Sequence, residues 1–178
     1  MKVLFIGDIV GRRARNYAQE KIIELKTKLK LDAIIVNVEN SAGGFGVTPS
    51  ICDDFFRVGA DVLTTGNHIW DKREIISYIT KNDRLLRPLN MIEGTPGLGM
   101  TTVDLDAGKI GVANIMTNLF MQKTDNVFDK IPDILENLKL KKNVDFSLVD
   151  IHGEASSEKM ALGNALDGQV TAVVGTHT

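Results

Sequence analysis

Residues 61–72 read DVLTTGNHIWDK, an apolar run that reaches a glycine and then presents an amide and an imidazole, Asn67 and His68. A Gly-Asn pair is common at turns, and one histidine beside a turn usually has no special role. A second explanation exists, because open α/β sheets hold their ligands at the carboxyl ends of their strands. The stretch alone does not decide between a simple turn and a ligand site at a strand end, so the rest of the chain must decide.

The alternation of strand, loop and helix recurs before and after this stretch. KVLFIGD (2–8) and DAIIVNVEN (32–40) are typical of buried strands, and residues 14–30 have the period of an amphipathic helix. Thr48-Pro49 is a start signal for a helix over about 48–58, and another helix is expected to begin near Asp71. The first half of the chain therefore predicts parallel strands joined by helices.

The second half begins with MTTVDLDAGKIGVANI (100–115), two short runs around Ala107-Gly108. This pattern favours a β-hairpin over another crossover, so a mixed sheet is expected. The remaining predicted elements are a helix over 127–141, a strand over 144–152, a helix from about 155 and a strand over 169–178.

The bulk composition indicates one globular domain, since the 178 residues are 43% hydrophobic and 25% charged. The net charge of −2 comes from 21 basic and 23 acidic residues without a long run of either sign, which indicates neither duplex nucleic acid nor a membrane surface as a partner. Cys52 is the only cysteine, so we expect a small core residue and no disulfide or cysteine-based zinc cluster. The apolar runs are too short for a membrane span or a signal peptide, and a cytoplasmic protein is expected.

Five predicted strands end on side chains that can bind a metal ion. These side chains are Asp8, then Glu39 with Asn40, then Asn67 with His68, then His152, and finally His177. Singly, Asp8 is more often a helix cap, Glu39 with Asn40 a solvated turn, and His152 a histidine satisfied by hydrogen bonds. Together they favour a site, because a cap needs no histidine and a core histidine needs no neighbouring carboxylate. Carboxylate, amide and imidazole ligands suit iron, manganese or zinc.

The number of candidate ligands favours two metal ions, because one catalytic ion typically uses about three protein ligands and leaves a position open for water. Two ions about 3.5–4 Å apart need a bridging group, and Glu39, central in the set, is the candidate. Such a pair lowers the pKa of a bound water and stabilises the entering and leaving oxygens of a phosphate. The ligand set therefore predicts phosphoester hydrolysis.

Five blocks of sequence carry a family resemblance: GDIVG, NVENSAGGFGVT, TTGNHIWD, DIHGEASSEK and VVGTHT. In this order and spacing they resemble the YmdB-like branch of the bacterial calcineurin-like metallophosphoesterases, from residue 1 to the last residue. The resemblance implies a four-layer α/β/β/α sandwich with mixed sheets, forming one metallophosphoesterase domain over 1–178. It also implies hydrolysis of small phosphodiesters, above all 2′,3′-cyclic nucleotides such as 2′,3′-cyclic AMP, with two ions of iron or manganese and attack by a metal-bound hydroxide.

The resemblance assigns a role to each candidate residue. One metal ion is held by Asp8, Glu39 and Asn40, and the other by Glu39, Asn67, His152 and His177. His68 is the general acid, since an imidazole that titrates near neutrality can protonate the departing ribose oxygen. The alternative for His68 is a hydrogen bond to a ligand without a part in the chemistry.

The sequence departs from the family pattern in two places. Val10 stands where the wider superfamily has a histidine two residues after the first aspartate, which is typical of this branch. The family's last block continues as His-Thr-His, whereas this sequence stops at Thr178. We therefore expect a longer natural chain with a histidine directly after Thr178, and a 178-residue form that binds the first metal weakly, catalyses poorly and tends to associate.

Two other functions compete with this interpretation. A metal-dependent regulatory protein that senses a nucleotide without turnover would tolerate the loss of His68, whereas an enzyme would not. A nicotinamide or flavin enzyme is disfavoured, because no G-x-G-x-x-G follows the first strand. The expected partner is a small cyclic nucleotide, and association of the chain into a homo-oligomer is compatible with the sequence.

Trp70 either stacks on a base of the substrate or anchors its loop in the core, and the anchor role is favoured.

Overall fold

Three parallel strands form the first sheet in a computed structural model that describes residues 1–178. In order across the sheet they are β1 (Val3–Ile6), β2 (Ala33–Asn37) and β3 (Val62–Thr64). Every residue of β2 is buried, as expected for the central strand of a parallel sheet that is covered on both faces. This burial explains why Ala33–Val36 form an unbroken apolar run rather than an alternating pattern.

The second sheet has four strands in the order β4-β5-β6-β7. Its first two strands, β4 (Met100–Leu105) and β5 (Gly108–Met116), form the predicted antiparallel hairpin, and Gly108 has a φ of 120° that favours glycine at the turn. The other two, β6 (Phe146–Gly153) and β7 (Ala172–His177), extend the sheet in parallel. The second sheet is therefore mixed.

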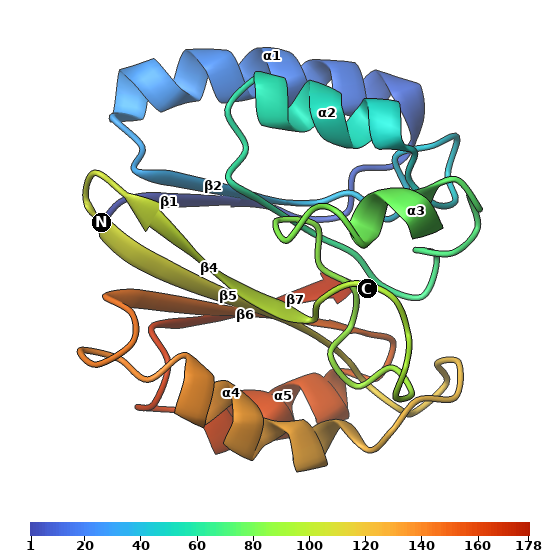
Figure 1. Cartoon of the computed structure of the whole chain (residues 1–178), viewed down its shortest axis with the longest axis vertical. Coiled ribbons are helices and arrows are strands. Elements are labelled where there is room, and N and C mark those ends of the chain that lie inside the picture. Colours follow the sequence, from blue (N-terminus) through green and yellow to red (C-terminus); the bar gives the residue numbers. More distant parts are fainter.

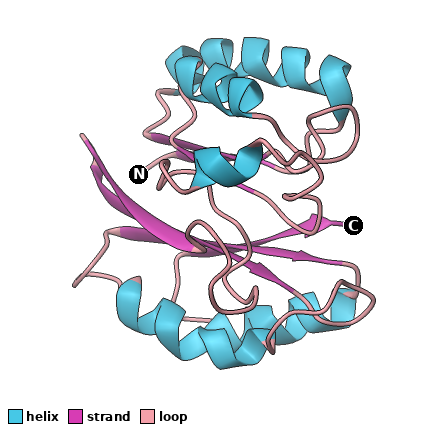
Figure 2. Cartoon of the chain, turned by 45° about the vertical axis from the view of Figure 1, so that its right-hand side comes forward, coloured by secondary structure: helices cyan, strands magenta, loops and turns pink.

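Helices cover the outer face of each sheet (Figures 1 and 2). The first sheet is covered by α1 (Gly11–Leu29) and α2 (Pro49–Arg57), and the second by α4 (Ile131–Asn137) and α5 (Ser156–Leu166). Two short helices remain, α3 (Ile75–Ile79) and the 3₁₀ helix η1 (Val127–Lys130). The predicted start of α2 is confirmed, because the Thr48 side chain accepts a hydrogen bond from the N–H of Ile51 and Pro49 is the first helical residue.

Three clusters of buried apolar side chains fill the spaces between the layers. Alternate residues of β2 point to opposite faces, so Val36 joins Ile22 in the cluster under α1 and α2, while Ile35 joins Val112 in the cluster between the sheets. A further cluster, which includes Ile134, packs α4 and α5 against the second sheet. The order is helices, sheet, sheet, helices, and the predicted α/β/β/α sandwich is confirmed.

Several predicted helix boundaries differ from the structure. The helix expected near Asp71 begins only at Ile75, because the Asp71 carboxylate contacts His68 Nδ1 at 2.8 Å and the preceding residues form turns. The helix predicted over 127–141 ends at Asn137, where the Asn143 amide donates to the free carbonyls of the last turn. The first helix begins at Gly11, three residues earlier than its apolar period indicated.

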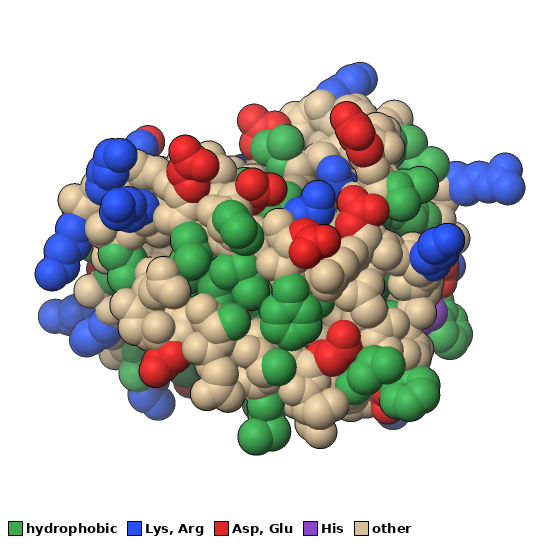
Figure 3. Space-filling model, turned by 90° about the horizontal axis from the view of Figure 1, so that it is seen from below, with side chains coloured by type: hydrophobic (Ala, Val, Ile, Leu, Met, Phe, Trp, Pro, Cys, Tyr) green, Lys and Arg blue, Asp and Glu red, His purple; other side chains and the backbone are tan.

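The outer surface of the α4 and α5 layer shows apolar side chains gathered near its centre, with acidic and basic side chains around them (Figure 3). None of the helices combines the length and the apolar character that crossing a membrane requires.

Cys52 is fully buried in the cluster under α1 and α2, which confirms its predicted place in the core. Burial raises the pKa of its thiol.

Candidate metal centre

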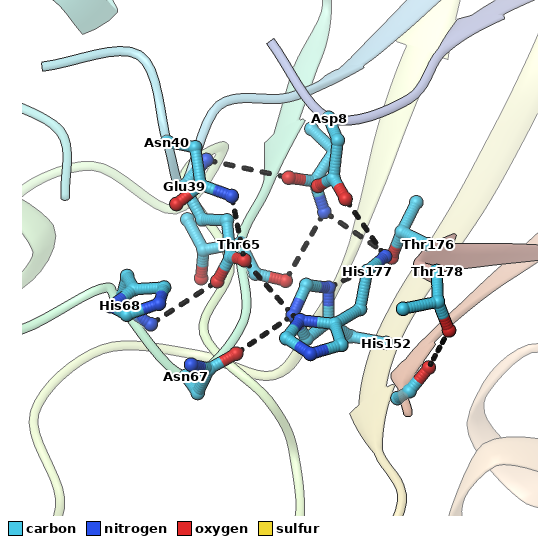
Figure 4. Close-up of polar contacts among 12 residues, drawn as sticks. Asp8, Glu39, Asn40, Thr65, Asn67, His68, His152, Thr176, His177 and Thr178 are labelled. Atoms are coloured by element: carbon cyan, nitrogen blue, oxygen red, sulfur yellow. Dashed lines mark hydrogen bonds and ion pairs between the residues drawn. The ribbon is translucent and has the colours of Figure 1, made fainter. Parts of the chain in front are cut away.

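The predicted site residues lie at or just after the carboxyl ends of strands, at one edge of the molecule that we call the carboxyl edge. They come from both sheets of the molecule. The residues after β1, β2 and β3 belong to the first sheet, while His152 and His177 belong to β6 and β7 of the second. The two sheets face each other, so their carboxyl ends meet and the side chains point toward one another (Figure 4).

His152 lies at the centre of this group. Its Nε2 atom is 3.0 Å from Glu39 Oε1, 3.0 Å from Asn67 Oδ1 and 3.2 Å from His177 Nδ1. The ligand atoms of Glu39, His152 and His177 lie within 4.8 Å of one another. One carboxylate, one amide and two imidazoles therefore present their ligand atoms to a common point, as one metal ion with mixed nitrogen and oxygen ligands requires.

Asp8 and Asn40 lie beside this group and carry unpartnered oxygens. Asp8 Oδ2 accepts a hydrogen bond from the N–H of His177 at 2.8 Å, and Asn40 Nδ2 donates to Glu39 Oε1 at 3.2 Å. The other oxygens, Asp8 Oδ1 and Asn40 Oδ1, are buried without a partner. A buried polar atom without a partner is costly, and a cation would satisfy both atoms. The residues present therefore fit a metal centre.

Glu39 is fully buried, and the two histidines next to it determine its charge. Burial acts to raise the pKa of Glu39, but the hydrogen bond and charge of His152 and the backbone N–H of His68 at 3.1 Å outweigh it. The net effect holds the pKa of Glu39 below its ordinary value. A buried carboxylate that stays ionised is suited to bind cations.

Gly66 allows the first sheet to approach His152 closely. A β-carbon at this position would lie 2.2 Å from His152 Nε2 and 2.4 Å from Glu39 Oε2. Contacts this short do not occur between non-bonded atoms, so any larger residue would push the two ligand groups apart. The packing of the site therefore requires a glycine at position 66.

His68 points away from the His152 group, although it follows Asn67 directly. Its Nδ1 atom is 2.8 Å from Asp71 Oδ2, and its ring makes an edge contact with Phe45, with the ring centroids 4.9 Å apart. About a quarter of the side chain (26%) is exposed. The Asp71 contact orients the ring and leaves Nε2 free to meet a substrate.

His177 is held in an unusual backbone conformation, with a φ of 82° that is uncommon outside glycine. Its backbone N–H is bound by Asp8, and its Nε2 is 3.1 Å from Glu154 Oε2. Residues held in such conformations cluster at functional sites.

Sequence reasoning missed three residues of this site: Asp71, Asp150 and Thr176. Asp150 and Thr176 connect to His152 Nδ1, where Thr176 Oγ1 lies at 2.9 Å and bonds Asp150 Oδ1 at 2.7 Å. For Asp150, the only signal in the sequence was its spacing from His152. It stands two residues before His152 on one strand, so the two side chains share a face of the sheet.

Trp70 packs against the core under α1 and α2, in agreement with the favoured anchor role.

Similar proteins support the predicted family. A 2′,3′-cyclic-nucleotide 2′-phosphodiesterase of Bacillus subtilis is 42% identical over 178 residues, which are 100% of this chain and 67% of the relative. Two solved structures cover 100% of this chain: a hypothetical protein from Thermus thermophilus, with 34% identity and a TM-score of 0.90, and a novel phosphatase from Mycoplasma pneumoniae, with 31% identity and a TM-score of 0.87.

This chain spans 68% of the Thermus chain and 64% of the Mycoplasma chain, so about two thirds of each relative is represented. The family described as YmdB-like protein matches residues 4–178. Together with the B. subtilis relative, this match confirms the predicted family: the chain belongs to the YmdB-like proteins.

Proposed function

We propose that this chain is a metal-dependent phosphodiesterase that hydrolyses 2′,3′-cyclic nucleotides such as 2′,3′-cyclic AMP. The observation that carries the proposal is the convergence of Glu39, Asn67, His152 and His177, with unpartnered oxygens of two further residues beside them. The names of the B. subtilis and M. pneumoniae relatives, a phosphodiesterase and a phosphatase, support the class of reaction. We further propose that residues 1–178 act as one metallophosphoesterase domain.

The residues divide into two sets of ligands around Glu39. We assign Asp8, Glu39 and Asn40 to one metal ion, and Glu39, Asn67, His152 and His177 to the other, with iron or manganese as the metals. Bound ions in such a pair act as Lewis acids, lower the pKa of a water and stabilise the charge of the reacting phosphate. Glu39 lies between the sets, because its Oε1 contacts both His152 and Asn40.

His68 supplies the proton in this proposal. Attack of water on the phosphorus breaks its bond to the ribose 2′ oxygen, and that oxygen must take up a proton as it leaves. Asp71 fixes the His68 ring through Nδ1, so Nε2 can carry the transferred proton. The product is the nucleoside 3′-phosphate, which accounts for all atoms of the substrate and the water.

The competing function, a nucleotide sensor without turnover, differs in what it needs from His68. The test measures hydrolysis of 2′,3′-cyclic AMP by the Mn²⁺-loaded protein, its His68→Ala variant and an Arg73→Ala control on the same exposed loop. We expect turnover to fall by about 100-fold or more in His68→Ala, with nucleotide binding and Mn²⁺ content retained. Tight nucleotide binding without product in the unmodified protein would favour the sensor instead.

A further inference from the structure

Phe45 is an exposed aromatic side chain on the loop between β2 and α2, and neither the apolar core nor the proposed reaction uses it. The residue is 59% exposed and belongs to none of the three buried clusters. Its ring contacts His68, with the ring centroids 4.9 Å apart and the ring planes at 64°. Such an edge contact leaves at least one face of the Phe45 ring uncovered by His68. An aromatic face is therefore open beside the proposed proton donor.

The shape of the loop holds Phe45 next to the segment that carries His68. The N–H of Ala42 donates a hydrogen bond to the carbonyl of Gly46 at 2.9 Å, which closes the loop directly after Phe45. Gly46 has a φ of 79°, and a β-carbon there would lie 2.9 Å from Lys72 Cγ and 3.2 Å from the backbone nitrogen of Lys72. The loop therefore packs against the chain that follows His68, and a larger residue at position 46 would separate the two segments.

The chemistry of the proposed substrate gives this aromatic face a use. In a 2′,3′-cyclic nucleotide, the base is joined to the ribose carbon next to the one that bears the 2′ oxygen. His68 has to reach that oxygen to protonate it, so the base lies close to the His68 ring during the reaction. Phe45 contacts the same ring. Every nucleobase has a π-face that can stack on an aromatic side chain, and stacking requires no particular pattern of hydrogen bonds.

We propose that Phe45 stacks on the nucleobase of the substrate and thereby places the ribose 2′ oxygen at His68. This role rests on the proposed function, because the base has this position only if His68 protonates the 2′ oxygen. The site then favours nucleoside cyclic phosphates over small cyclic phosphodiesters that carry no base. The alternative is a role confined to packing against His68, which gives no advantage to a substrate with a base.

The test compares 2′,3′-cyclic AMP with glycerol 1,2-cyclic phosphate, which has the same cyclic phosphate ring and no base. Phe45→Ala removes the aromatic ring, and Phe45→Trp retains an aromatic face. Tyr17→Ala is the matched control, because Tyr17 is an aromatic residue of similar exposure, 63%, on α1. Steady-state kinetics of the Mn²⁺-loaded proteins give kcat/KM for each substrate, and calorimetry gives the affinities for 3′-AMP and for inorganic phosphate.

We expect Phe45→Ala to lower both kcat/KM for 2′,3′-cyclic AMP and the affinity for 3′-AMP by about 5- to 100-fold, the range that stacking of one base on an aromatic side chain accounts for. Hydrolysis of glycerol 1,2-cyclic phosphate and the affinity for inorganic phosphate should stay near the values of the unmodified protein, since neither molecule has a base. Phe45→Trp and Tyr17→Ala should behave like the unmodified protein in every assay.

Three results would overturn the proposal. Absent 3′-AMP binding by the unmodified protein, or an unchanged affinity in Phe45→Ala, would show that the ring does not hold the base. Equal losses of kcat/KM for both substrates in Phe45→Ala would show that Phe45 acts only by packing against His68. A failure of the proposed function gives a different result: the unmodified protein hydrolyses neither cyclic phosphate, while its 3′-AMP affinity still falls in Phe45→Ala and the stacking role stands.

Discussion

Replacing Gly66 by alanine tests how closely the two sheets approach at the carboxyl edge. The added β-carbon would lie 2.2 Å from His152 Nε2 and 2.4 Å from Glu39 Oε2, whereas non-bonded heavy atoms prefer about 3.5–4.0 Å. Both neighbours are fully buried, so neither can move into solvent. Overpacking of this kind costs about 1–3 kcal/mol of unfolding free energy. Because the free energy of unfolding falls by about 2 kcal/mol per molar urea, the urea concentration at the unfolding midpoint should fall by about 0.5–1.5 M.

The matched control is Gly163→Ala in α5, where no atom lies within 4 Å of the added β-carbon. There the substitution should raise the free energy of unfolding by about 0.5–1 kcal/mol, because alanine is a better helix former than glycine. The assay is urea unfolding of both variants in chelator, followed by Mn²⁺ titration of the folded proteins. Opposite shifts of the midpoint are expected, with weaker Mn²⁺ binding only in Gly66→Ala. Equal stabilisation of both variants, with unchanged Mn²⁺ binding, would refute the close packing at His152.

Three further predictions follow from the same geometry. Glu39→Gln keeps the shape of the side chain and removes the charge that both proposed ions share, so equilibrium dialysis should find less Mn²⁺ at both positions. If one ion stayed bound at full occupancy, Glu39 would be a ligand of the other ion alone. Asp71→Asn should lower kcat by about 10- to 100-fold at unchanged Mn²⁺ content, and an unchanged kcat would exclude Asp71 from orienting His68. Cys52 should react with a thiol reagent only as fast as the chain unfolds, since it is buried with a raised pKa, and fast labelling in native buffer would contradict its place in the core.

The sequence pattern predicted the strands and the polar residues at their ends, because both follow from local periodicity. The first four residues of β2, Ala33–Val36, form an apolar run shortly before Glu39, and the turn before Gly108 separates two runs of the correct length for a hairpin. The family resemblance then supplied the two-sheet architecture, which local pattern alone does not contain. The pattern predicted parallel strands joined by helices without dividing them between sheets, and the structure brings the carboxyl ends of two sheets together.

Contacts between side chains far apart in the sequence were not predictable in the same way. The hydroxyl of Thr64 and the carboxylate of Asp150 are 86 residues apart, and nothing in either strand marks the other as its partner. The helix expected to begin near Asp71 begins only at Ile75 for a related reason. A carboxylate before an apolar run is typical of a helix start, whereas here the carboxylate of Asp71 bonds His68. Tertiary contacts overrode the local signal at both places.

The central claim is that metal ions bind where the two sheets meet at the carboxyl edge. Anomalous diffraction from crystals grown with Mn²⁺ tests it most directly, because the signal locates the metal independently of any activity. We predict a peak at bonding distance, about 2 Å, from Glu39, His152 and His177, with a second peak beside Asp8 and Asn40. Crystals that contain Mn²⁺ elsewhere, with His152 Nε2 still hydrogen-bonded to Glu39 and Asn67, would contradict the claim.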